Sequence, residues 1–255
     1  MDADVCCKKV ACPHFVHKKG NEMKKDKKAV VLLSGGLDSS TCLYKAIEDG
    51  YVPYALCFDY GQRHLKAVES SRRIAEKAGA IFKKIKIDLR QIGGSALTDN
   101  IEVPTGREIK EIARDIPPTY VPARNTIFLS VALSFSEVID AEAIYMGANM
   151  IDNPGYPDTT PRYIETYQKL INVALKKTVK GGKIEIKTPL IRMTKKEIVQ
   201  EAVRLMVPLE LTWSCYQGEE EPCGQCDACR LRAKGFREAG LTDSLCQKSD
   251  SDVHA

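Results

Sequence analysis

The chain has 255 residues, of which 44% are hydrophobic and 28% charged, a composition typical of globular proteins. No apolar run reaches the roughly 18 to 20 residues of a membrane-spanning helix, and no secretory signal is present, so we expect a soluble, cytoplasmic protein. The net charge of +4 comes from residues 1–28, where eight lysines face four acidic residues, and the neutral body gives no support for a nucleic-acid-binding groove.

Residues 1–28 lack apolar periodicity, so the sequence predicts a flexible, lysine-rich extension, with Met23 as an alternative start of the protein. Five potential metal ligands lie in this extension: Cys6, Cys7, Cys12, His14 and His17. Their spacing matches no common metal-binding finger, so we predict no metal site at these residues.

Short apolar runs and amphipathic stretches alternate from Ala29 onward. Strands are expected at residues 29–33, 54–58, 81–87, 143–147 and 184–187, and helices at 39–48, 63–78, 124–138, 162–177 and 195–205. A long insertion at 91–123, with one short helix at 107–113, follows the third strand. The alternation predicts an α/β fold with a Rossmann-like parallel sheet, helices on both faces and ligands at the carboxyl ends of the strands.

The first strand-to-helix turn reads Ser34-Gly35-Gly36-Leu37-Asp38-Ser39-Ser40. Adjacent glycines let the backbone approach an anion, hydroxyl groups supply donors, and the start of a helix favours negative charge, so a phosphate or pyrophosphate fits here. Asp38 would repel an anion on its own. We therefore expect either a Mg²⁺ ion between Asp38 and the phosphates or an N-cap role for Asp38. The turn matches neither the Walker pattern nor the dinucleotide fingerprint.

This turn resembles the Ser-Gly-Gly-x-Asp-Ser loop of the ATP pyrophosphatase (PP-loop) superfamily. Members of that superfamily have an adenine nucleotide alpha hydrolase-like fold, cleave ATP between its α and β phosphates and adenylate a carbonyl or carboxylate oxygen. The resemblance implies a set of ATP-binding residues: Leu33, Ser34, Gly35, Gly36, Leu37, Asp38, Ser39, Ser40, Thr41, Cys42 and Leu43.

Four cysteines cluster near the C-terminus: Cys215, Cys223, Cys226 and Cys229. In a reducing compartment such a cluster indicates a metal site before a disulfide. Four thiolates leave no open coordination position, so we expect one structural Zn²⁺ ion, with an iron–sulfur cluster as the alternative.

Further motifs narrow the resemblance. They are Phe58-Asp59-Tyr60-Gly61-Gln62-Arg63-His64, Val121-Pro122-Ala123-Arg124-Asn125, Gly155-Tyr156-Pro157-Asp158 and Thr188-Pro189-Leu190. Together with the loop and the cysteines, they resemble the 7-cyano-7-deazaguanine synthase family of queuosine and archaeosine biosynthesis over residues 29–243. The resemblance implies a homodimeric ligase that converts 7-carboxy-7-deazaguanine and ammonium, with ATP and Mg²⁺, into a nitrile through an acyl adenylate and an amide.

The resemblance also implies roles for individual residues. The catalytic candidates are Asp38, Arg63, His64 and Arg124, and the substrate-binding candidates are Tyr156, Asp158 and Arg162. A carboxylate at Asp158 can accept two hydrogen bonds from the N1–H and 2-amino edge of a guanine-like base. Thr159 and Thr160 depart from the family pattern, which places a small residue and then an arginine after this aspartate, so Arg162 is the substitute candidate for binding the substrate carboxylate.

The expected organisation is an extension at 1–28, an ATP-binding and catalytic domain at 29–210, a zinc-binding segment at 211–243 and a flexible tail at 244–255. Two other functions share the loop. One is a PP-loop tRNA-modifying enzyme of the sulfur-transfer or lysidine type, which the neutral body disfavours, and the other is an adenine-nucleotide sensor. No segment is long enough for a glutaminase domain, so the ammonia is expected from free ammonium or from another protein.

Overall fold

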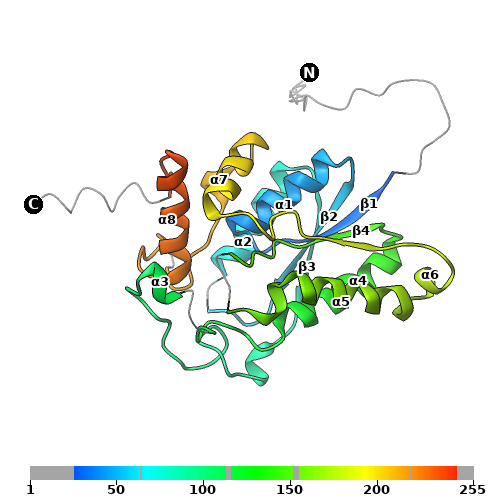
Figure 1. Cartoon of the computed structure of the whole chain (residues 1–255), viewed down its shortest axis with the longest axis horizontal. Helices are drawn as coiled ribbons and strands as arrows, with labels where there is room; N and C mark the ends of the chain where they lie inside the picture. The colour runs from blue at the N-terminus through cyan, green and yellow to red at the C-terminus, as the bar shows by residue number, and fades with distance from the viewer. Residues whose placement is uncertain (1–25, 64, 113–115, 152–154, 219, 246–255) are drawn as a thin grey trace, which may run out of the picture.

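A computed structural model describes residues 26–63, 65–112, 116–151, 155–218 and 220–245 (Figure 1). Five strands form one parallel sheet in the order β3-β2-β1-β4-β5. Their bounds are Lys28–Leu32 (β1), Val52–Asp59 (β2), Ile81–Lys86 (β3), Ala143–Tyr145 (β4) and Glu185–Lys187 (β5). The strand order reverses at β1, and this kind of switch point is where open α/β sheets bind ligands.

Helices cover both faces of the sheet, as predicted. Side chains alternate along β1, so Val31 packs on one face and Val30 on the other. The first face is covered by α1 (Leu37–Glu48), α2 (Lys66–Lys77) and α7 (Lys195–Arg204). The second face is covered by α4 (Arg124–Ile139) and α5 (Pro161–Ala174), which lie together below the sheet in the view of Figure 1.

Several elements differ from the expected ones. The helix expected at 162–177 ends at Ala174, because Leu175 is extended and a separate short helix, α6, follows at Lys176–Val179. The Thr178 hydroxyl donates to the carbonyl oxygens of Ile171 and Leu175, at 2.8 and 3.2 Å, and so stabilises this break. The helix expected at 107–113 is the single turn Ile109–Ile112 (α3). Short 3₁₀ turns lie at Leu89–Gln91, Pro157–Thr159 and Leu209–Leu211.

A C-terminal helix that the sequence analysis missed, α8, runs from Asp227 to Ala239 and ends at Gly240, whose φ is +70°. It packs with the insertion after β3 in a third apolar core, which contains Leu97, Val103 and Trp213. The segment after residue 210 therefore lies against the α/β sheet through this core. The domain boundaries themselves stay predictions.

No helix in the described ranges is long and apolar enough to cross a membrane. The extension at 1–25, with Cys6, Cys7, Cys12, His14 and His17, lies outside the described residues, as do His64 and the tail from 246 onward.

Candidate active site

The turn between β1 and α1 depends on two close backbone approaches. Gly35 has a φ of +82°, and a Cβ atom on it would lie 2.4 Å from the carbonyl oxygen of Ala67. A Cβ atom on Gly147, which follows β4, would lie 3.0 Å from the backbone nitrogen of Ser39. Glycine is therefore required where α2 and β4 meet the loop.

Hydroxyl groups fix the shape of this turn. The Ser34 and Ser39 hydroxyls lie 3.0 Å apart, and the Ser40 hydroxyl donates to the carbonyl oxygen of Gly36 across 2.8 Å. Gly36 occupies the N-cap position of α1 without a side-chain cap. The first N–H groups of α1 have no acceptor within the helix and are available to an anion.

Asp38 is the second residue of α1, so the alternative that it serves as the N-cap is wrong. Its two carboxylate oxygens each accept a hydrogen bond of 2.9 Å from the ammonium group of Lys195. Lys195 is the first residue of α7, and its side chain is only 11% exposed. The N-termini of two helices therefore meet through this ion pair.

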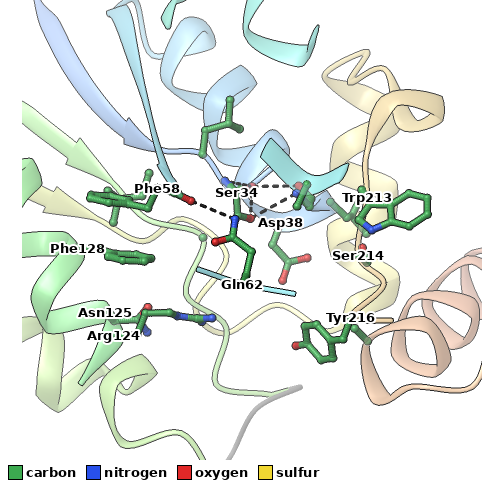
Figure 2. A pocket seen from close by; sticks show the side chains of 18 of the residues that line it. Ser34, Asp38, Phe58, Gln62, Arg124, Asn125, Phe128, Trp213, Ser214 and Tyr216 are labelled. Atoms are coloured by element: carbon green, nitrogen blue, oxygen red, sulfur yellow. Dashed lines mark hydrogen bonds between the residues drawn. The ribbon is translucent and has the colours of Figure 1, made fainter. Parts of the chain in front are cut away.

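A cavity of about 340 Å³ opens at the carboxyl ends of β1 and β2. On one side it is lined by Ser34, Gly36, Asp38 and Ser39 of the loop. Arg124 and Asn125 reach it from the start of α4, and Trp213, Ser214 and Tyr216 reach it from the C-terminal segment (Figure 2). One space thus connects the turn between β1 and α1 with the cationic side chain of Arg124.

Aromatic rings form the wall next to β2. Phe58 and Phe128 stack with their ring centroids 4.0 Å apart and their planes within 4°. Gln62 lies beside them and holds the end of β2 in place, because its Oε1 accepts from the backbone N–H of Tyr60 across 2.8 Å. Its position between the loop and the aromatic pair is visible in Figure 2.

Arg124 is surrounded by phenol groups. Its guanidinium lies 5.9 Å from the ring centroid of Tyr60 and donates to the Tyr60 hydroxyl across 3.5 Å. No carboxylate of the described residues is within ion-pair distance of Arg124. The preceding residue, Ala123, has a φ of +52°, an unfavourable conformation for alanine that turns the chain into α4.

Asp158 lies in the 3₁₀ turn Pro157–Thr159 and is 5% exposed. Its Oδ2 accepts from the backbone N–H of Asn125 across 3.3 Å, whereas its Oδ1 is buried without a hydrogen-bond partner among the described residues. Burial raises the pKa of the Asp158 carboxyl, and the Asn125 hydrogen bond and the Arg124 charge only partly oppose this shift. A buried acceptor without a partner is unfavourable until a donor reaches it.

The Sγ atoms of Cys215, Cys223, Cys226 and Cys229 all lie within 4.8 Å of one another. Hydrogen bonds from the Cys226 and Cys229 thiols, and then from backbone N–H groups including that of Cys223, lower the pKa of Cys215. The four thiols therefore form a site for a metal ion.

The cysteine site joins the C-terminal segment to the insertion. Thr105 pairs with Cys226 as an isolated antiparallel bridge, and the backbone N–H of Gly106 donates to the carbonyl oxygen of Gln225 across 3.0 Å. Beside it, Arg107 forms an ion pair with Asp227 at the start of α8.

A second ion pair is buried at the wall of the cavity. Arg232 and Asp243 are 5% and 4% exposed and form two hydrogen bonds, of 2.5 and 3.0 Å. Arg232 also donates to the hydroxyl groups of Thr212 and Ser214, at 2.7 and 3.4 Å. It thereby holds the segment that leads to Cys215.

A sequence profile described as queuosine biosynthesis protein QueC matches residues 28–240. The chain belongs to this family. The 7-cyano-7-deazaguanine synthase of Thermoplasma volcanium is 54% identical over 219 residues, which cover 86% of this chain and 90% of that protein. The synthase of Trichodesmium erythraeum is 52% identical over 220 residues, covering 86% and 99%. The QueC family assignment confirms the resemblance drawn from the motifs.

A solved structure of a 4-thiouridine synthetase with RNA and ATP is also similar to this QueC chain. It is 18% identical and has a TM-score of 0.44. The match covers 84% of this chain and 50% of that protein.

The structure brings many of the predicted site residues of this QueC chain to the cavity. The predicted residues among those that line it are Leu33, Ser34, Gly36, Leu37, Asp38, Ser39, Arg63, Arg124, Tyr156 and Cys215. The Arg63 guanidinium is already held by the carbonyl oxygens of Asp99 and Ile101, at 3.0 and 2.5 Å.

Other predicted residues lie away from the cavity surface. Thr41, Cys42 and Leu43 are fully buried behind the loop. Gly35, Ser40 and Asp158 are also not among the residues that line the cavity. Arg162 is exposed on α5 and is not among the residues that line the cavity.

The sequence analysis missed several residues that line the cavity, among them Gln62, Phe128, Lys195, Trp213 and Tyr216. For Lys195 a signal was present. The pattern Thr194-x-x-Glu197 forms a capping box, which marks the start of a helix after a strand and hence an edge of the sheet where ligands bind.

Proposed function

We propose that this chain catalyses the ATP-dependent conversion of 7-carboxy-7-deazaguanine and ammonia into 7-cyano-7-deazaguanine, as a ligase of queuosine biosynthesis. The observation that carries the proposal is the single cavity that joins the anion-binding loop to Arg124 and Tyr156. Relatives that are 54% and 52% identical bear the name of this enzyme.

The reaction requires activation of a poor electrophile. A carboxylate oxygen attacks the α-phosphorus of ATP, which releases pyrophosphate and leaves an acyl adenylate. Ammonia then displaces AMP and forms the amide. A second ATP activates the amide oxygen in the same way, and loss of that oxygen with AMP, together with protons from nitrogen, gives the nitrile. The protein contributes positioning and charge stabilisation.

The loop is suited to the pyrophosphate part of ATP. Its N–H groups at the start of α1 and the hydroxyls of Ser34 and Ser39 face the cavity. The carboxyl end of β2, near Phe58 and Gln62, is the proposed contact for adenosine. Mg²⁺ would be held by Asp38 and would neutralise phosphate charge.

Asp158 is the proposed partner of the base. Its buried Oδ1 has no donor among the described residues, and the N1–H and 2-amino groups of a deazaguanine are donors of the right kind. Tyr156, two residues earlier, lines the cavity and would contact the same ligand.

We assign the substrate carboxylate to Arg124 rather than to Arg162. Arg124 lines the cavity and has no carboxylate partner among the described residues, whereas Arg162 is exposed. Comparing the two steps of the reaction tests this assignment, because the first step uses the charged carboxylate and the second uses the neutral amide. Arg124→Gln is expected to slow conversion of the acid and to spare conversion of the corresponding amide, with Arg162→Gln as the control. Equal losses on both substrates would contradict the assignment.

The cysteine site is proposed to hold one structural Zn²⁺ ion. In a tetrahedral site with Zn–S bonds of about 2.3 Å, the sulfurs lie about 3.8 Å apart. Sulfurs that all lie within 4.8 Å of one another are therefore close to the spacing for one ion, whereas a cluster of several irons would hold them farther apart. Metal analysis of the purified protein distinguishes zinc from iron.

The proposed activity is tested by incubating the protein with Mg²⁺, ATP, ¹⁵N-ammonium and 7-carboxy-7-deazaguanine, followed by mass spectrometry. We expect the nitrile to carry one ¹⁵N atom and to form with two AMP and two pyrophosphate molecules. ATP that stays intact with an unchanged base would contradict the proposal and would favour a sensor or tRNA-modifying function. A homodimer, a cytoplasmic location and a supply of ammonia from free ammonium or from another protein belong to the same proposal.

A further inference from the structure

A second, smaller pocket adjoins the cavity. It has a volume of about 20 Å³, enough for one molecule of about the size of water. Four residues line both spaces: Tyr156, Tyr216, Ala228 and Leu231. The small pocket is partly open and lies between α3, the start of α8 and the segment that begins at Gly155. It therefore borders the cavity across a wall that contains two phenol rings.

The small pocket offers more hydrogen-bond acceptors than donors. The hydroxyls of Thr119 and Tyr156 lie 3.1 Å apart and bond to each other, so one of their two protons is left for a further acceptor. The carboxylate of Asp227 accepts from two guanidinium nitrogens of Arg107 and retains further lone pairs. Water donates two hydrogen bonds, whereas ammonia donates three and accepts one. Ammonia therefore matches this set of groups better than water does.

The charge of the small pocket favours a neutral occupant. Asp227 is the one charged residue among the described residues that line it, and the ion pair with Arg107 neutralises this carboxylate. A cation would exchange its water shell for a site without a free countercharge, which is unfavourable. Ammonia is thus favoured over ammonium, whose extra proton stays with the solvent.

The wall between the two spaces lies next to Arg124. Burial raises the pKa of the Tyr156 and Tyr216 phenols, and the positive charge of Arg124 partly opposes both shifts, so both rings lie near its guanidinium. Figure 2 shows the Tyr216 side chain pointing from the C-terminal segment toward the side of the cavity where Arg124 lies. Because Arg124 is the proposed partner of the substrate carboxylate, a molecule that leaves the small pocket between these rings reaches the carbon that ammonia attacks.

We propose that the small pocket binds ammonia and delivers it between Tyr156 and Tyr216 to the acyl adenylate. The nitrogen lone pair forms a bond to the acyl carbon, the bond from that carbon to the AMP oxygen breaks, and AMP leaves with the electron pair while one N–H proton passes to solvent. The inference rests on the proposed function, because it requires an acyl adenylate in the cavity. The alternative is a pocket that holds a fixed water molecule and takes no part in the reaction.

The two steps of the reaction give the test an internal control, because ammonia enters only the first. Conversion of the acid needs ammonia, whereas conversion of the amide to the nitrile needs ATP alone. Variants of the small pocket should therefore have a raised KM for ammonium but unchanged KM values for ATP and for 7-carboxy-7-deazaguanine. Their conversion of the amide should be unchanged, and a high ammonium concentration should restore their conversion of the acid.

Thr119→Val removes a hydroxyl of the small pocket and nearly preserves the shape of the side chain. Loss of one hydrogen bond should raise the KM for ammonium about twofold to tenfold. Thr126→Val is the matched control, because the Thr126 hydroxyl lies 2.8 Å from that of Tyr163 and Thr126 lines neither space. A KM for ammonium that rises equally in the two variants would overturn the proposal.

Ile112→Phe narrows the small pocket, because Ile112 is 6% exposed and lines this pocket but not the cavity. The KM for ammonium should rise roughly tenfold. More of the acyl adenylate should then be lost to water, so the AMP released per nitrogen atom incorporated should increase. Ile116→Phe is the control, because it makes the same change at a position that is 58% exposed. An unchanged KM for ammonium in both Thr119→Val and Ile112→Phe would overturn the proposal and favour the fixed water molecule.

Failure of this inference is distinct from failure of the proposed function. An unmodified protein that forms the nitrile, together with pocket variants whose KM for ammonium is unchanged, would remove only the ammonia site. An unmodified protein that forms no nitrile would remove the proposed reaction and the ammonia site with it.

Discussion

Trp213 connects Gly35 to Cys215. Its backbone N–H donates to the carbonyl oxygen of Gly35 across 2.7 Å, and its indole Nε1–H donates to the carbonyl oxygen of Cys215 across 3.1 Å. Trp213 therefore contacts both the left-handed glycine of the β1–α1 turn and Cys215, the first residue of the cysteine site. Trp213 is also the single tryptophan of the chain, so its fluorescence reports on both regions.

Removing the metal should therefore disturb the nucleotide loop. A chelator is expected to shift the emission of Trp213, which is 5% exposed, toward longer wavelength, to lower the melting temperature and to weaken ATP binding. Fluorescence spectra, thermal unfolding and calorimetry of ATP binding measure these three effects. Zn²⁺ added back should restore them, and Cys229→Ser should reproduce the chelated state. Unchanged ATP affinity in a demetallated protein with shifted emission would show that the two regions are independent.

Gly35→Ala should lower the free energy of unfolding and the affinity for ATP far more than Gly50→Ala does. Both glycines have a φ of +82°, so both substitutions introduce the same backbone strain of about 1 to 2 kcal/mol. Only Gly35 has backbone atoms in the way, because a Cβ atom at Gly50 meets nothing within 4 Å. Urea unfolding and ATP titration of the pair measure the difference. If the two variants lose the same free energy of unfolding, the close approach of α2 to the loop is not a constraint.

Asp158→Asn should weaken binding of the base and stabilise the free protein. The substitution removes the carboxylate charge that strengthens the hydrogen bonds from the base. The Kd for the deazaguanine should therefore rise roughly tenfold to a hundredfold, while the affinity for ATP stays unchanged. Because burial raises the pKa of Asp158, its favourable contribution to stability is present at acidic pH and is lost as the pH rises through the raised pKa. The stability difference between the variant and the unmodified protein should therefore be largest at neutral pH and shrink below about pH 4.

Urea unfolding at several pH values and base titration by calorimetry measure these two effects. Glu165→Gln, an exposed acid-to-amide change on α5, is the control. Unaltered base affinity in Asp158→Asn would remove its assigned role.

Arg232→Met should destabilise the protein by about 3 to 5 kcal/mol, because it leaves the Asp243 carboxylate buried without its guanidinium partner. Adding Asp243→Asn should recover part of the loss, and a double-mutant cycle in urea gives the coupling energy. A coupling energy of zero would mean that Arg232 and Asp243 stabilise the protein through their other contacts and not through their ion pair.

The parts of the site that sequence could predict are contiguous in the chain. The loop from Ser34 to Ser40 and the cysteines from Cys215 to Cys229 each carry their chemistry within a short segment, so spacing alone identifies them. Lys195 and Asp38 are 157 residues apart, and no local pattern links them. Their contact is set by the strand order, which brings the start of α7 to the start of α1.

Other differences come from contacts between neighbouring elements. The helix α8 starts at the cysteine site, where Cys226 is the N-cap. Because this segment is polar and rich in cysteine, its apolar periodicity is too weak to predict a helix. The early end of α5 depends on the hydroxyl of Thr178 in the next element. Arg162 was a reasonable candidate from its place after Asp158, but its side chain points to solvent because α5 buries Ile164 and Tyr167 instead.

The Trp213–Gly35 hydrogen bond also links the β1–α1 turn to a residue that is synthesised late. Protein synthesis reaches Lys187, the end of β5, before Trp213 and the four cysteines have been made. At ordinary elongation rates, Cys229 follows Lys187 after a delay on the order of 2 to 8 s. During this interval the chain contains the residues of all five strands but not Trp213, whose backbone N–H donates to Gly35, so the β1–α1 turn reaches its final set of hydrogen bonds only after the C-terminal segment has been made.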